Sequence, residues 1–195
     1  MTGPADAIRI DPVTALPPPP DAGPVARRGG VRDRADRSLL APTTFDRVLA
    51  AGAAVLLLAV LVALARGFGQ WAQLPAALWV HILTILVALA LTPVMLLRPR
   101  GDRRHRRLGW VWAAALFLTA AVSFLVRTAP DGGFSVIHLL SAFTLLQVPL
   151  IIWTARTHRW ARHRSAVRGM VTGALLIAGF FTFPFGRLMG TWLFG

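Results

Sequence analysis

The sequence predicts an all-α membrane protein, built as a five-helix antiparallel transmembrane bundle with a disordered N-terminal tail. Three observations lead to this fold class. Hydrophobic residues make up 55% of the 195 residues and the mean hydropathy is +0.60, which is more apolar than an ordinary soluble domain. The apolar residues form continuous runs instead of one face of each element. The arginines concentrate in alternate connections between these runs.

Each of the five apolar runs is long enough to cross a bilayer core of about 30 Å at about 1.5 Å per helical residue. The predicted spans are 48–65, 78–97, 108–126, 134–154 and 170–194. We expect Thr44 or Asp46 to cap the first of these helices, because short polar side chains satisfy the free amides of a helix start. The bundle domain is therefore predicted over residues 45–195.

Residues 1–44 have a different composition and predict a disordered cytoplasmic tail. They contain four consecutive prolines (17–20), a glycine pair and scattered charges, with no helical or strand period. Such a segment buries too little apolar surface to offset the entropy lost on ordering. The alternative is that this tail docks on a partner protein.

The positions of the arginines predict how the chain is threaded. Six arginines lie from Arg98 to Arg107 and five from Arg156 to Arg168, whereas the other two connections hold only Arg66 and Arg127. Basic loops stay on the cytoplasmic side of a membrane. The sequence therefore predicts a multi-pass protein of the bacterial inner membrane, with its N-terminus cytoplasmic and its C-terminus periplasmic.

The net charge of +13 indicates anionic partners. Because the arginines flank apolar spans, we expect these partners to be anionic lipid head groups at the inner face and not nucleic acid. The residues expected to contact head groups are Arg103, Arg104, His105, Arg106, Arg107, His158, Arg159, Arg162, His163 and Arg164. The absence of cysteine excludes disulfides, thiolate metal sites and thiol catalysis.

Three polar residues inside the predicted spans form the candidate site. His81 lies near the outer start of the second span, His138 near the outer start of the fourth, and Arg187 near the outer end of the fifth. At about 1.5 Å per residue, each side chain is expected roughly 5 Å beneath the outer surface. Ionisable residues at such a depth face the bundle interior and often mark function.

One interpretation is a haem b between the second and fourth spans, with His81 and His138 as iron ligands and Arg187 paired with a propionate. A bare metal or a quinone at the same residues is a second interpretation. In the third, the imidazoles make ordinary hydrogen bonds between helices and Arg187 extends to lipid phosphate.

The leading functional hypothesis is accordingly a small b-haem electron-transfer or redox-associated membrane subunit. The alternative is a non-catalytic membrane scaffold that assembles with a larger membrane complex. A transporter ranks third, because no Asp or Glu lies inside any predicted span. No catalytic residue can be assigned, since phosphate-binding loops and hydrolase motifs are missing from the sequence. We do not expect the chain to be an enzyme on its own.

Residues 77–195 carry short motifs that resemble a bacterial family of predicted membrane proteins, domain of unknown function 2306. The motifs are His81 at the start of a span, His105-Arg106-Arg107-Leu108-Gly109 before the next span, His158-Arg159-Trp160 after the fourth, and the segment from Phe181 to Arg187. The resemblance implies a helical membrane bundle and no particular reaction.

Overall fold

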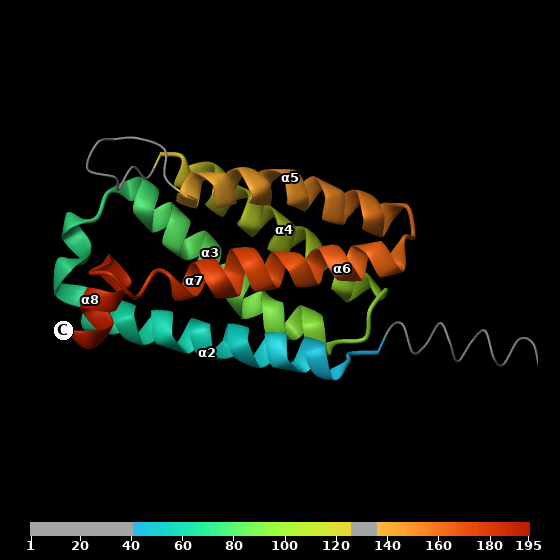
Figure 1. Ribbon diagram of the computed structural model, residues 1–195, viewed down its shortest axis with the longest axis horizontal. Coiled ribbons are helices and arrows are strands. Elements are labelled where there is room, and N and C mark those ends of the chain that lie inside the picture. Colours follow the sequence, from blue (N-terminus) through green and yellow to red (C-terminus); the bar gives the residue numbers. More distant parts are fainter. Residues whose placement is uncertain (1–40, 126–135) are drawn as a thin grey trace, which may run out of the picture. The chain divides into compact units, whose positions relative to one another are not determined.

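The computed structural model describes residues 41–125 and 136–195, and all its regular elements there are helices (Figure 1). The all-helical class is therefore confirmed for this part of the chain. Most of the predicted tail, residues 1–40, and the connection 126–135 lie outside the described residues. The elements are α2 (Thr44–Arg66), the 3₁₀ helix η1 (Phe68–Gln73), α3 (Ala76–Leu97), α4 (Arg103–Ser123), α5 (Val136–Arg156), α6 (Trp160–Met170), the π-helical segment η2 (Val171–Ile177), α7 (Ala178–Phe180) and α8 (Leu188–Phe194).

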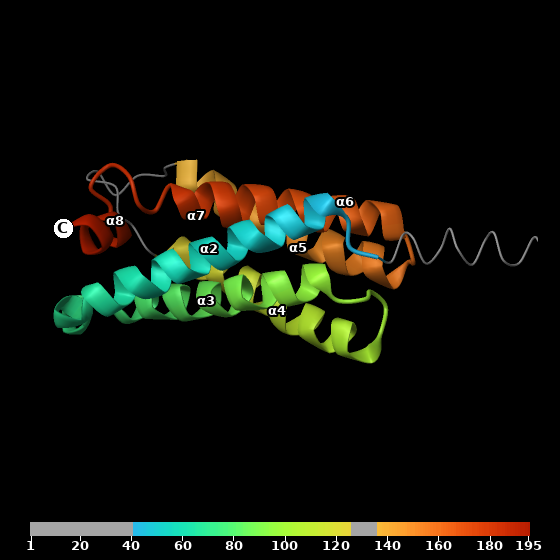
Figure 2. The same ribbon diagram turned by 90° about the horizontal axis from the view of Figure 1, so that it is seen from below.

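The long helices form a closed ring in chain order. Each of α2 to α6 packs against the next helix in the chain, and η2, which continues α6, packs back against α2 (Figures 1 and 2). The core of the ring is apolar and contains Leu89, Leu116, Met170 and Leu175, each at most 2% exposed. This closure brings the start of α2 beside the two arginine-rich connections.

Three helices of the described chain are long and apolar enough to cross a membrane: Thr44–Arg66, Ala76–Leu97 and His138–Arg156. They match the first, second and fourth predicted spans. The prediction of five spans is not confirmed. α4 begins with four arginines within its first five residues, which lowers the hydropathy of the helix as a whole.

The fifth predicted span, 170–194, is not one helix, and this boundary prediction was wrong. Helix runs continuously from Trp160 to Phe180 through α6, η2 and α7, and the chain then turns before α8. Pro184 explains the break because proline disfavours helical backbone at the preceding residue and has no amide hydrogen. Phe185 and Gly186 next adopt positive φ angles of 66° and 65°, which end any regular helix.

The start of α2 also differs from its prediction. Thr43, and not Thr44 or Asp46, is the N-cap, and its side chain accepts a hydrogen bond from the Asp46 amide. The Asp46 carboxylate in turn accepts one from the Thr43 amide at 2.9 Å. This reciprocal pair is a capping box, which satisfies two of the free amides at a helix start.

A seam of polar side chains joins α3 to α4. Trp112 Nε1 donates to Thr92 Oγ1 at 2.9 Å, Thr119 donates to Thr84 at 2.7 Å, and Ser123 Oγ lies 3.0 Å from His81 Nδ1. Small residues between these pairs, such as the fully buried Ala88, let the two helices approach closely. The seam fixes the register of α3 against α4.

Replacing Thr92 by valine tests the seam. The substitution leaves the buried indole N–H of Trp112 without its acceptor, and we expect the free energy of unfolding to fall by about 0.6–2 kcal/mol. Detergent-induced unfolding followed by tryptophan fluorescence measures this change. Thr157→Val is the control, because the exposed Thr157 hydroxyl follows the end of α5 and donates to the Trp153 carbonyl of that helix, not to a neighbouring helix. Equal destabilisation by both substitutions would contradict the role given to the seam.

At the other end of the bundle, α8 folds back over the end of α2 (Figure 1). The Trp192 ring lies directly against Gly67, where a β-carbon would overlap the indole. Trp192 Nε1 also donates to Gln70 Oε1 at 2.9 Å. The C-terminal helix therefore covers the end of α2 that is remote from the arginine-rich connections.

Candidate functional site

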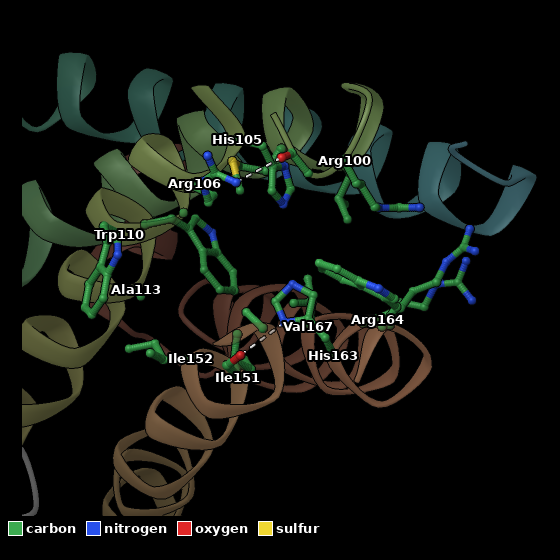
Figure 3. Close-up of a pocket in the computed structure, with 18 of the residues that line it drawn as sticks. Arg100, His105, Arg106, Trp110, Ala113, Ile151, Ile152, His163, Arg164 and Val167 are labelled. Carbon is green, nitrogen blue, oxygen red and sulfur yellow. Dashed lines mark hydrogen bonds between the residues drawn. The ribbon is translucent and has the colours of Figure 1, made fainter. Parts of the chain in front are cut away.

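The candidate site is a pocket of about 300 Å³ at the arginine-rich end of the bundle (Figure 3). Its walls are apolar and come from α3 to α6 and the start of η2. The wall residues include Met95, Leu96, Trp110, Trp112, Ala113, Ile151, Ile152, Val167 and Val171. Five arginines and one carboxylate also line the pocket: Arg100, Arg106, Arg156, Arg164, Arg168 and Asp46. The pocket therefore combines an apolar interior with a large excess of positive charge.

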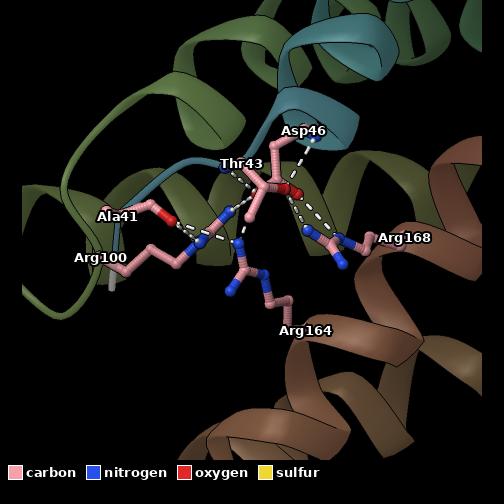
Figure 4. A network of polar contacts seen from close by, with 6 residues as sticks. All are labelled: Ala41, Thr43, Asp46, Arg100, Arg164 and Arg168. Atoms are coloured by element: carbon pink, nitrogen blue, oxygen red, sulfur yellow. Dashed lines mark hydrogen bonds and ion pairs between the residues drawn. The ribbon is translucent and has the colours of Figure 1, made fainter. Parts of the chain in front are cut away.

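Asp46 organises three of these arginines (Figure 4). Its Oδ2 accepts from Arg100 Nη2 at 2.9 Å and from Arg164 Nη2 at 2.8 Å, and its Oδ1 accepts from Arg168 Nε at 2.8 Å. The Asp46 side chain is completely buried, and the three guanidinium groups are mostly buried. One carboxylate thus joins α2, the α3–α4 connection and α6.

Asp46, Arg100, Arg164 and Arg168 together form the Asp46 cluster, which carries an excess of positive charge. A buried carboxylate needs several hydrogen bonds to offset its lost hydration, and here the capping box and three guanidinium groups supply them. One negative charge nevertheless faces three positive charges in a site with restricted access to water. Such an arrangement favours binding of a further anion.

Two histidines point into the pocket from opposite sides (Figure 3). His105 belongs to the first turn of α4, where its amide donates to Oδ1 of the N-cap residue Asp102 at 2.6 Å. His163 belongs to the first turn of α6, and its Nδ1 lies 3.1 Å from the carbonyl oxygen of Ile151. The fold therefore brings two imidazoles from separate helices to one cavity.

Burial favours the neutral form of both imidazoles. Burial lowers the pKa of His105 below its ordinary value, and the nearby His163 and Arg100 lower it further. Burial also lowers the pKa of His163, although its hydrogen bond to Ile151 acts in the opposite direction. Neutral imidazoles are the form that binds a metal ion.

The residues predicted to contact lipid head groups divide into two sets. His105, Arg106, His158, His163 and Arg164 line the pocket. Arg103, Arg104, Arg107, Arg159 and Arg162 do not line it, and their side chains are exposed. Of this second set, Arg159 lies over the Trp153 ring at 4.7 Å from its centroid. Half of the ten residues predicted to contact lipid head groups therefore line the pocket.

The residues of the predicted haem site lie elsewhere. His81 contacts Ser123 in the polar seam, and His138 is buried with its ring 5.7 Å from that of Phe124. Arg187 is exposed at the N-cap of α8. None of the three lines either pocket described in this part of the chain. The assignment of His81, His138 and Arg187 to a cofactor stays a prediction.

Sequence reasoning missed Asp46, Arg100, Arg156 and Arg168 as site residues. A partial signal existed, because Thr43-x-x-Asp46 has the spacing of a capping box and Asp46 is the single acid between residues 37 and 101. An isolated acid beside a basic inner surface indicates a paired carboxylate. Its three partners could not be identified, because they lie 54 to 122 residues away in the sequence.

Comparisons of the chain with family models, with curated proteins and with solved structures find no match. The resemblance to domain of unknown function 2306 therefore stays a prediction, and the site has to be interpreted from its own residues.

Proposed function

We propose that the protein is an integral membrane protein that binds an anionic amphiphile in the pocket at its arginine-rich end. One observation carries this proposal: an apolar-walled cavity is lined by five arginines and a single carboxylate. Ligand pockets typically pair apolar walls with a few polar groups that fix the orientation of the ligand. Here those polar groups are mainly guanidinium groups.

The chemistry of the pocket defines the class of ligand. Guanidinium groups bind carboxylates and phosphates through paired N–H donors. The tryptophan and aliphatic walls suit a hydrophobic body. A phospholipid of the inner leaflet and an apolar cofactor with carboxylate groups both meet this description. In the proposed orientation the pocket opens at the cytoplasmic face of the bacterial inner membrane.

This proposal differs from the scaffold hypothesis in requiring a bound ligand. A scaffold protein would use its helix surfaces to contact another membrane protein, and its arginines would contact lipid head groups without selecting one of them. The b-haem hypothesis, in contrast, falls within the proposed class, because haem b carries two carboxylates on an apolar ring system.

Arg106 and Arg107 provide a matched pair for testing the proposal. Both side chains are exposed, but Arg106 lines the pocket and its neighbour Arg107 does not. Loss of one charge-assisted hydrogen bond, worth about 1.5–3 kcal/mol, should weaken ligand binding by roughly 10- to 100-fold in Arg106→Gln. Arg107→Gln should bind as the unaltered protein does.

Native mass spectrometry of the protein released from phosphatidylcholine nanodiscs that contain phosphatidylglycerol measures the retained anionic lipid. Retention that depends on Arg106 and not on Arg107 supports the proposal. Equal retention by both variants would contradict a specific pocket and would leave the scaffold hypothesis ahead.

A further inference from the structure

His105 and His163, two of the three histidines that line the pocket, do more than add polarity to the cavity. A carbonyl oxygen can only accept a hydrogen bond, so His163 must donate from Nδ1 to Ile151. In the neutral ring this leaves the lone pair on Nε2. A histidine that binds a metal is typically oriented in the same way, through a hydrogen bond from its other nitrogen to a carbonyl group.

His105 completes the pair from the opposite side of the pocket. Its Nδ1 is buried and has no hydrogen-bond partner among the residues that the structure describes. A buried polar atom without a partner is unfavourable unless a ligand or water satisfies it. The side chain points into the pocket, where a bound group can supply this contact (Figure 3).

The number of candidate ligands restricts the kind of metal centre. Within residues 41–125 and 136–195, no group of three or more His, Cys, Asp or Glu side chains is placed to hold a metal ion. A bare zinc ion needs three or four protein ligands. Haem iron already has four ligands from its macrocycle and takes one or two axial ligands from the protein. Two facing imidazoles therefore suit haem iron better than a bare ion.

The geometry points to haem b as the anionic amphiphile of this pocket, with His105 and His163 as its axial ligands and the pocket arginines paired with its propionates. This inference rests on the proposed function and specifies its ligand. It places the haem of the original hypothesis at the arginine-rich end of the bundle. Bound haem would give the protein a one-electron redox centre, and the tryptophan and aliphatic walls would exclude water from it.

Titration of the purified full-length protein with haemin tests the inference. The unaltered protein should give the sharp Soret band of six-coordinate, low-spin iron. His105→Ala and His163→Ala should each shift the spectrum to a five-coordinate, high-spin form. Added imidazole should restore the low-spin spectrum, because it can occupy the space left by the missing side chain.

A control variant makes the test specific. His81→Ala with His138→Ala removes two histidines that do not line the pocket and should leave the spectrum unchanged. Loss of the low-spin spectrum in that double variant alone would overturn the inference.

The lipid experiment separates failure of this inference from failure of the proposed function. If haemin gives no spectral change while retention of phosphatidylglycerol depends on Arg106, the haem assignment is wrong and the proposed function stands. If no amphiphile depends on Arg106, the proposed function fails as well. A low-spin spectrum that persists in both His105→Ala and His163→Ala would also overturn the assignment of these ligands.

Discussion

Asp46→Asn should lower the free energy of unfolding by about 3–5 kcal/mol, the usual effect of removing one partner of a buried ion pair. The change removes the negative charge that three buried guanidinium groups share, and these groups then repel one another at close range. Because the groups come from the α3–α4 connection and from α6, the arginine-rich end of the bundle should open first. Detergent-induced unfolding measures the loss.

The control is Asp102→Asn. Asp102 is an exposed N-cap whose ion pair with Arg98 spans 3.6 Å. Asparagine caps a helix as well as aspartate does, and exposed ion pairs contribute little to stability, so this variant should unfold almost as the unaltered protein does. Similar effects of the two substitutions would show that the Asp46 cluster does not stabilise the bundle. A bound anionic ligand should partly rescue Asp46→Asn, because it replaces the lost negative charge.

Gly190→Ala is expected to destabilise the C-terminal helix α8 by about 1–3 kcal/mol. A methyl group at residue 190 would overlap the backbone carbonyl of Phe183, which cannot move aside as a side chain can. Helix propensity alone predicts that the substitution stabilises α8, since alanine is favoured over glycine by about 1 kcal/mol in a helix. The expected result is release of α8 from α2, measured as faster hydrogen exchange of residues 188–194.

Gly169→Ala is the matched substitution. Gly169 also lies in a helix, but a β-carbon there meets no atom within 4 Å. Helix propensity then acts unopposed, and the variant should be more stable by about 0.5–1 kcal/mol. We therefore expect Gly190→Ala to be less stable, and Gly169→Ala more stable, than the unaltered protein. A stabilised Gly190→Ala variant would mean that α8 does not pack against the turn at Phe183 in the membrane.

The helices were predictable where a helix coincides with an uninterrupted apolar run. α2 and α3 cover the predicted spans 48–65 and 78–97 within a few residues, because length and hydropathy alone define them. The predicted fifth span does not match one helix, because a hydropathy pattern does not reveal where the helical backbone is interrupted. The apolar run 170–194 continues through Pro184 and Gly186, whereas the helix stops at Phe180.

The predicted starts of two helices also hid part of the site. Because the predicted fifth span started at residue 170, His163 was assigned to a surface loop, whereas α6 begins ten residues earlier and carries His163 into the bundle. His105 was misjudged in a similar way, since α4 starts at Arg103 and not at residue 108. The Asp46 cluster depends on contacts between distant segments, and no local pattern records which arginines will meet a given carboxylate.

The Asp46 cluster also has a consequence for the order in which the protein assembles. Arg100 lies 54 residues after Asp46, and Arg164 and Arg168 lie 118 and 122 residues after it. Because synthesis proceeds from the N-terminus, α2 is made long before two of its three arginine partners exist. A chain that has been extended only through α4 can form the Arg100 contact alone. The last two ion pairs form only when α6 reaches α2, so α2, the first of the described helices to be made, gains two of its three arginine contacts only after α6 has been made.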